Sequence, residues 1–299
     1  MDHVGEWAAL GAAALWSGGY LAFTAAVRRI GADNVNRLRL LLALGILATA
    51  HLVVYGVVVP TAAEGARWVW LGLSGVIGFT LADAFLFRAL YHLGPHRTSV
   101  VTALIPVSSA FLAWVTMGER LSRTQFLGVG ITVFAVVLIV TGRPSPGEKD
   151  ASRNPRRGVL FALGAVAAQS LRYVLCVKGM SGGFPVLSTN VMQILAAAVA
   201  AWVLALLGGR WRSTFDALRN RPAAAATAVG AVVGPVLGVT LSLVALSASR
   251  VGVASTLMAL SPVFLLPLSW LVFRERVTWR SVVGTALAVG GVAVLWLAQ

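Results

Sequence analysis

Residues 93–121 read LGPHRTSVVTALIPVSSAFLAWVTMGERL, and residues 249–277 read SRVGVASTLMALSPVFLLPLSWLVFRERV. The second stretch repeats the first at a constant offset of 156 residues, without a gap. The matched positions include Ser99 and Ser255, Ala103 and Ala259, Pro106 and Pro262, Trp114 and Trp270, and Glu119 and Glu275. Such a register indicates an internal duplication of the chain.

The first helix of the chain also has a copy. ALGAAALWSGGY at residues 9–20 matches ALGAVAAQSLRY at residues 162–173, so the duplication extends over five helices in each half. Between the halves, the polar stretch RPSPGEKDASRNPRR offers no apolar surface to bury and is typical of a solvated linker. We therefore expect a first repeat over residues 1–142, a linker over 143–156 and a second repeat over 157–299.

The composition is that of a chain embedded in lipid. Hydrophobic residues make up 58% of the 299 and charged residues 11%, whereas soluble domains carry about 25% charged residues. The mean hydropathy is +0.85. The predicted fold class is an all-α polytopic membrane protein with ten transmembrane helices in two inverted five-helix repeats. The expected helices cover residues 7–27, 36–58, 68–90, 98–118, 124–142, 157–177, 185–207, 223–247, 252–273 and 279–297.

Five helices per repeat predict the symmetry, and the charges predict the orientation. Five crossings leave the second repeat inverted relative to the first, with a substrate path between them near the membrane midplane. Most of the 24 Lys and Arg residues follow odd-numbered helices, which places those joints in the cytoplasm and both termini outside it. The net charge of +14 therefore serves membrane topology and lipid headgroups and does not indicate nucleic-acid binding. The predicted location is the bacterial inner (plasma) membrane, with multiple passes.

The chain carries no signature of a cofactor, metal or disulfide site. Cys176 is the one cysteine, and the four histidines are scattered. No grouping of acid, nucleophile or metal ligands lies at matching depth, which argues against an intramembrane enzyme. No phosphate-binding loop occurs, so ATP does not drive the protein directly.

The paired segments TALIPVSSA and GERL, together with the small-residue first helix, resemble those of the drug/metabolite transporter superfamily, EamA type. The resemblance covers nearly the whole chain, and the second copy departs from it at Arg274, where RERV stands. It implies a secondary transporter that exports small amphipathic metabolites such as amino acids by alternating access. An uncoupled channel or facilitator and a lipid or drug efflux carrier remain as alternatives. The expected partners are a small-molecule substrate and membrane lipid, with proton coupling as a hypothesis and a monomer or homodimer as the assembly.

Relatives in this superfamily are drawn with cytoplasmic termini, which disagrees with the charge bias. We follow the charges here.

Two ionisable residues lie deep in the predicted spans. Asp83 is the acidic one and Arg172 the basic one; each costs about 2.5–3.5 kcal/mol at the bilayer centre and is a functional candidate by default. Their helical positions put them at different depths, so Arg39 is the better partner for Asp83. Asp83 is then either a coupling carboxylate that exchanges a proton or a permanent ion pair that braces two helices.

Aromatic residues are the other candidates for a binding cavity. Trp16 and Tyr20 lie one turn apart in the first helix, opposite Gln169 and Tyr173 in its copy. Trp114 and Trp270 are further candidates, although Trp and Tyr collect at membrane interfaces for other reasons. The predicted substrate-binding set is Trp16, Tyr20, Phe79, Asp83, Gln169, Arg172 and Tyr173.

Proline and glycine mark the flexible or closely packed positions. Pro106 and Pro262 fall inside the predicted fourth and ninth helices and predict either hinges or static kinks. Gly230, Gly234 and Gly238 predict close helix packing. Glu119 and Glu275 close the repeated segment and are interpreted as solvated terminal charges, with a role in a gate as the alternative.

Overall fold

The computed structural model of the chain describes residues 3–117, 123–141, 154–248, 254, 257–273 and 279–297. Within these ranges the chain is helical apart from short joints, and no strand occurs. Six of the helices there are long and apolar enough to cross a membrane, and shorter apolar stretches lie at 126–138, 261–272 and 281–294. The prediction of an all-α polytopic membrane protein is confirmed.

The helices follow one another in the same order in both halves. The first half contains α1 (Val4–Ile30), α2 (Ala32–Tyr55), α3 (Gly65–Gly75), the π-helix η1 (Val76–Ala82), α4 (Asp83–Leu93), α5 (Pro95–Thr102), α6 (Ile105–Met117) and α7 (Arg123–Thr141). The second half contains α9 (Pro155–Met180), α10 (Val186–Leu207), α11 (Trp211–Ala217), α12 (Arg221–Ala231), the π-helix η2 (Val232–Gly238), α13 (Val239–Ala248), α15 (Ser261–Phe273) and α16 (Trp279–Leu297). The short α11 was not predicted.

The third and eighth predicted helices each contain a π-helical turn. η1 begins at Val76 and η2 at Val232, so the two turns are separated by the same 156 residues as the repeated sequence. η2 includes Pro235, whose missing N–H is compatible with a widened turn. π-helical turns are frequent at functional sites because they leave backbone groups free, and the duplication has kept one in each half.

The fourth predicted helix is broken rather than kinked. α5 ends at Thr102, and α6 begins at Ile105. Pro106 is therefore in the first turn of a new helix, where its missing N–H has no partner to lose. Pro262 likewise is the second residue of α15. The prediction of prolines in the middle of continuous helices was wrong on this point, while their use as hinges stays a prediction.

The second helix begins earlier than predicted, at Ala32 instead of residue 36. A single residue, Gly31 with φ of 80°, separates it from α1, because a turn this tight needs the positive φ that glycine tolerates. Arg37 and Arg39 consequently lie inside α2 and are buried. The prediction placed both at the start of this helix, and the structure adds residues 32–35 before them, so they lie deeper in the helix than predicted.

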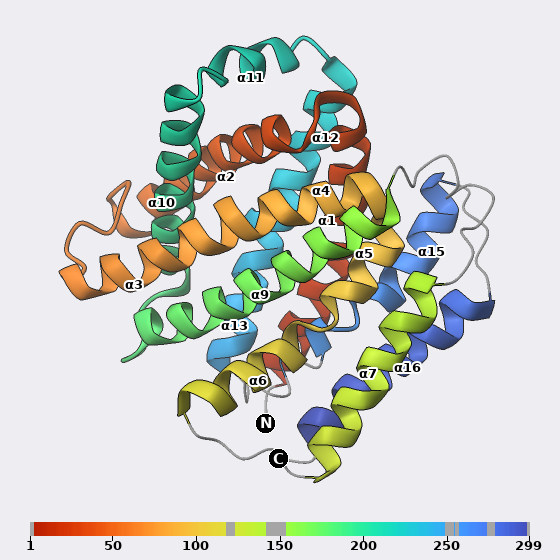
Figure 1. Ribbon diagram of the computed structural model, residues 1–299. Coiled ribbons are helices and arrows are strands. Elements are labelled where there is room, and N and C mark those ends of the chain that lie inside the picture. The colour runs from red at the N-terminus through yellow and green to blue at the C-terminus, as the bar shows by residue number, and fades with distance from the viewer. Residues whose placement is uncertain are drawn as a thin grey trace.

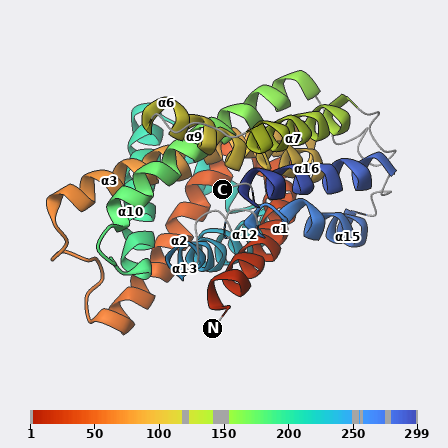
Figure 2. The same ribbon diagram turned by 90° about the horizontal axis from the view of Figure 1, so that it is seen from below.

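The two halves interdigitate. α1 packs against α12, η2, α13 and α15 of the second half, whereas α9 packs against α3, η1, α4, α5 and α6 of the first. α7 lies beside α16, and in both views this pair is set at one side of the bundle (Figures 1 and 2). The first helix of each repeat thus forms part of the core of the other repeat.

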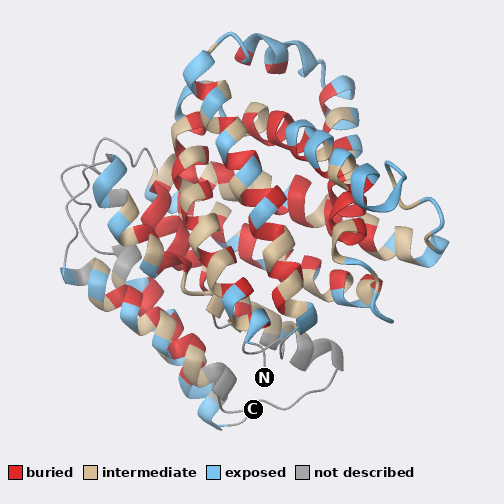
Figure 3. Cartoon of the chain, turned by 180° about the vertical axis from the view of Figure 1, so that it is seen from behind, coloured by how far each residue is buried: buried red, intermediate tan, exposed pale blue. Residues whose placement is uncertain are grey.

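Burial follows the expectation for a protein surrounded by lipid. Buried residues gather in the middle of the bundle, and exposed ones lie on outer faces and joints (Figure 3). Large apolar side chains such as Val53 and Leu207 are about 80% exposed, which a lipid environment makes favourable. The centre, by contrast, contains several buried polar side chains.

Candidate functional site

A cavity of about 810 Å³, counted with the space at its mouth, lies between the interdigitated halves. A second pocket adjoins it and shares Trp16, Tyr20, Thr102, Ile105 and Tyr173 with it. The seven predicted binding residues all line the main cavity: Trp16, Tyr20, Phe79, Asp83, Gln169, Arg172 and Tyr173. The structure therefore brings them together, and their role in binding a substrate stays a prediction.

Helix α1 supplies the aromatic wall of the cavity. Trp16 and Tyr20 are four residues apart and so share a face of the helix. Trp16 lies against bare backbone at Gly238, where an added methyl group would come within 2.7 Å of its ring. Gly230 and Gly234 accept the ring of Phe23 in the same way, so the predicted packing role of these glycines is confirmed. The hydroxyls of Tyr20 and Thr102 are 2.9 Å apart and hydrogen bonded.

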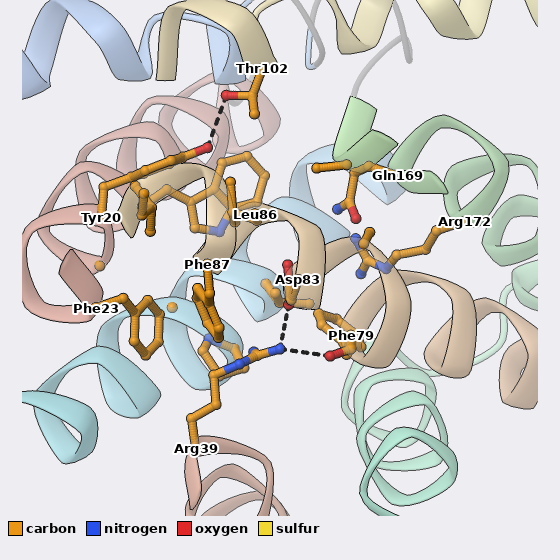
Figure 4. Close-up of a pocket in the computed structure, with 18 of the residues that line it drawn as sticks. Tyr20, Phe23, Arg39, Phe79, Asp83, Leu86, Phe87, Thr102, Gln169 and Arg172 are labelled. Atoms are coloured by element: carbon orange, nitrogen blue, oxygen red, sulfur yellow. Dashed lines mark hydrogen bonds and ion pairs between the residues drawn. The ribbon is translucent and has the colours of Figure 1, made fainter. Parts of the chain in front are cut away.

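Asp83 and Arg39 form an ion pair across the cavity floor, as predicted (Figure 4). The Arg39 side chain is 2% exposed and that of Asp83 is 15% exposed. Arg39 also donates to Asn36 Oδ1 at 2.9 and 3.1 Å and to the carbonyl oxygen of Phe79 at 2.9 Å. Its guanidinium lies 5.0 Å from the ring centroid of Phe87. The charge of Arg39 is thus fully compensated.

Arg172 is placed differently. It is 1% exposed, and its guanidinium lies 4.3 Å from the ring centroid of Phe79. It donates one hydrogen bond, from Nη2 to Gln193 Oε1 at 3.2 Å. Within the described ranges no carboxylate is within ion-pair distance of it, and its Nε has no hydrogen-bond partner. The prediction that Asp83 and Arg172 form no direct pair is confirmed.

Helices α2 and α10 share an asparagine that contacts a π-helical turn, but they differ three residues further along. Asn36 donates to the carbonyl oxygen of Thr80 in η1 at 3.2 Å, and Asn190 donates to that of Pro235 in η2 at 2.9 Å. Both bonds satisfy backbone oxygens in the π-helical turns. Three residues further along each helix stand Arg39 and Gln193. Aligning the sequence of α2 with that of α10, so that Asn36 matches Asn190 and Arg39 matches Gln193, would have identified these four residues from the sequence.

Two serines join the halves at the helix breaks. Ser17 donates to the carbonyl oxygen of Ser261 at 2.8 Å, and Ser170 donates to that of Ile105 at 3.2 Å. Each accepting residue directly precedes a proline, Pro262 or Pro106, and both prolines line the adjoining pocket. The contacts are related by the duplication, and they place the predicted hinges beside the cavity.

Some predicted residues fall elsewhere. Trp270 is 60% exposed and lines neither pocket, so its expected place in the aromatic wall was wrong. Glu119 and Glu275 lie outside the described residues, as does the side chain of Trp114. Among the residues that the structure describes, no group of three metal-binding side chains occurs.

Comparison with known proteins agrees with this architecture. The family model described as "EamA-like transporter family" matches residues 3–141 and again residues 156–297. The chain belongs to this family. The two matches correspond to the two repeats that the sequence predicted.

Two relatives match parts of the chain. The chain is 25% identical over 143 residues to the "Uncharacterized transporter YyaM" of Bacillus subtilis, covering 48% of this chain and 45% of that protein. It is 37% identical over 76 residues to the "Uncharacterized membrane protein YMR253C" of Saccharomyces cerevisiae, covering 25% of this chain and 18% of that protein. The matches thus span less than half the length of these relatives.

A solved structure titled "Crystal structure of protein" superposes on this EamA-like transporter with a TM-score of 0.62. The two chains are 20% identical, and the alignment covers 97% of this chain and 96% of the other. At this identity the likeness shows a shared fold.

Proposed function

We propose that this EamA-like transporter is a secondary transporter that exports small amphipathic metabolites, such as amino acids, by alternating access between its two repeats. The observation that supports it is the cavity, whose walls come from both halves. Aromatic rings of Trp16, Tyr20 and Phe79 offer apolar surface, and Asp83 and Arg172 offer polar groups. Such a mixture suits a small solute with one apolar and one charged part.

The interdigitated packing supports alternating access as the mechanism. Each first helix is bonded through a serine to the broken helix of the other half, at Ser261 and Ile105. A rocking movement of one repeat would lengthen one contact and shorten the other, because the two contacts are related by the duplication. The helix breaks beside Pro106 and Pro262 would absorb the rotation, as hinge residues at helix ends commonly do.

Proton coupling through Asp83 is the second part of the proposal. Asp83 is held by Arg39 in this conformation, and an ionised carboxylate is stabilised there by the adjacent charge. Movement of α2 relative to α4 would separate the pair and favour uptake of a proton. The persistence of the pair throughout the cycle would instead favour the alternative, an uncoupled facilitator.

Transport in proteoliposomes tests the proposal. Purified protein is reconstituted, and uptake of radiolabelled amino acids and related amphipathic solutes is measured as counterflow and under an imposed pH gradient. We expect counterflow of at least one solute, and pH-gradient-driven uptake that Asp83→Asn abolishes while exchange remains. Equal uptake with and without the gradient in the wild type would support the facilitator, and no flux for the whole panel would contradict transport. Efflux from preloaded cells compared with cells lacking the protein tests the direction.

A further inference from the structure

The charges around the cavity do not balance. Among the residues that the structure describes, the lining contains two guanidinium groups, Arg39 and Arg172, and one carboxylate, Asp83. Arg39 and Asp83 neutralise each other by direct contact. Arg172 therefore contributes a net positive charge to a space that is largely apolar. An uncompensated buried charge is strongly unfavourable, and occupation by an anion relieves it.

The guanidinium of Arg172 points into the cavity toward Asp83 and lies beside Gln169 (Figure 4). Of its five N–H donors, the one hydrogen bond to another described residue goes to Gln193. A guanidinium presents paired donors that match the two oxygens of a carboxylate. The unused donors thus provide a place for an anionic group on the cavity wall.

The surroundings hold this arginine in position. The side chain of Arg172 passes over the bare backbone of Gly78, where a methyl group would lie 2.0 Å from its Cδ. Gln193, which accepts from Arg172, itself donates to Ser74 Oγ at 2.8 Å. Ser74 donates in turn to the backbone carbonyl oxygen of Arg172 at 3.2 Å. Together with the ring of Phe79, these contacts orient the charge before any solute enters.

We propose that Arg172 binds the carboxylate of the transported solute, so that the substrates are organic monoanions with an aromatic or aliphatic body. This inference rests on the proposed transport function and narrows its substrate class, from small amphipathic metabolites that include zwitterionic amino acids to organic monoanions. The aromatic wall of Trp16 and Tyr20 accepts the apolar body. A zwitterion is bound less well, because Asp83, the carboxylate in the described part of the lining that would accept an ammonium group, is already paired with Arg39.

Four probes with the same phenylalkyl body and different charge test this inference: 3-phenylpropanoate, 3-phenylpropanamide, phenylalanine and phenethylammonium. Binding to the purified full chain in nanodiscs is measured by calorimetry, and flux is measured in proteoliposomes. We expect the anion to bind at least about tenfold more tightly than the amide, because hydrogen bonds to charged groups exceed neutral ones by this order. The zwitterion should fall between the anion and the cation.

Variants distinguish the effect of the Arg172 charge from the effect of its position in the cavity. Arg172→Gln should lower the affinity for the anion to that for the amide and leave the amide unchanged, and Arg172→Lys should keep part of the preference. Gly78→Ala should reduce the preference as well, because its methyl group displaces the guanidinium without changing any charge. Lys178→Gln is the matched control: it removes a positive charge from the same helix, where Lys178 lies over Trp70 outside the cavity.

Equal binding of anion and amide by the wild type, or an anion preference that survives Arg172→Gln, would overturn the assignment. A protein that moves solutes in the proteoliposome panel but binds no anion retains the transport function and loses the substrate class. A protein that binds the anion through Arg172 but moves no solute retains the anion site and loses the transport function. The two proposals can therefore fail separately.

Discussion

Replacing Asp83 with Asn leaves the buried guanidinium of Arg39 without its counter-ion. Removing one partner of a buried ion pair costs about 3–5 kcal/mol of folding free energy. Here Arg39 keeps its bonds to Asn36 and to the Phe79 carbonyl and its contact with the Phe87 ring. Because these contacts still solvate part of the charge, we expect a loss near the lower limit, about 3 kcal/mol.

A double-mutant cycle isolates the contribution of the pair. Arg39→Gln in the Asp83→Asn background removes the stranded charge, so the double variant should recover about 2 kcal/mol of the loss. The free energy of unfolding is measured by denaturant titration in mixed micelles. Asp33→Asn is the control, because the Asp33–Arg88 pair joins partly exposed side chains at 2.7 Å and should contribute at most about 1 kcal/mol.

Two results would refute the reasoning. Wild-type stability of Asp83→Asn would mean that Arg39 does not depend on the carboxylate. A double variant no more stable than Asp83→Asn would mean that the loss comes from packing and not from the stranded charge.

Three further predictions concern topology, hinges and packing. A reporter active only outside the cytoplasm and fused after Gln299 should be active, and activity from a cytoplasmic reporter alone would reverse the orientation. Pro106→Ala and Pro262→Ala should leave folding intact and slow counterflow, whereas full transport by the double variant would make both prolines static. Gly75→Ala should cost about 1–3 kcal/mol of stability, because its methyl group would lie 2.1 Å from a backbone oxygen of α10. Gly45→Ala is the control and should be neutral or slightly stabilising, because no atom lies within 4 Å of the added methyl group. Equal shifts of the melting temperature for Gly75→Ala and Gly45→Ala would contradict the close packing of Gly75 against α10.

Local sequence accounted for much of the site. Trp16 and Tyr20 were found because their spacing puts them on one helical face, and Gln169 and Tyr173 followed from the duplication. Asp83 was found because a carboxylate is expensive within a hydrophobic span. The depth of Arg39 was underestimated, since the predicted helix began at residue 36, whereas the one-residue turn at Gly31 lets α2 begin at Ala32.

Other features depend on contacts between distant segments. By sequence, Pro106 is compatible with either a kink or the start of a helix. In the structure a new helix starts at Ile105, and the hydroxyl of Ser170 from the other half donates a hydrogen bond to the carbonyl oxygen of that residue. The contact of Gly78 with Arg172 joins residues that are 94 positions apart in the chain. Trp270 was indistinguishable by sequence from the aromatic residues that do line the cavity, because interface and cavity positions use the same residue types.

The sequence by itself determined that this chain is a duplicated helical membrane protein, because a hydrophobic run must satisfy its backbone groups within its own helix and the two copies share one register. It also determined which residues are costly in lipid and therefore worth attention. It indicated Arg39 as the partner of Asp83, and the structure contains that pair. Only the tertiary structure decided what surrounds Arg172. Its side chain crosses Gly78 and lies against the ring of Phe79, both in the opposite half, because α9 packs between first-half helices, which local periodicity does not encode.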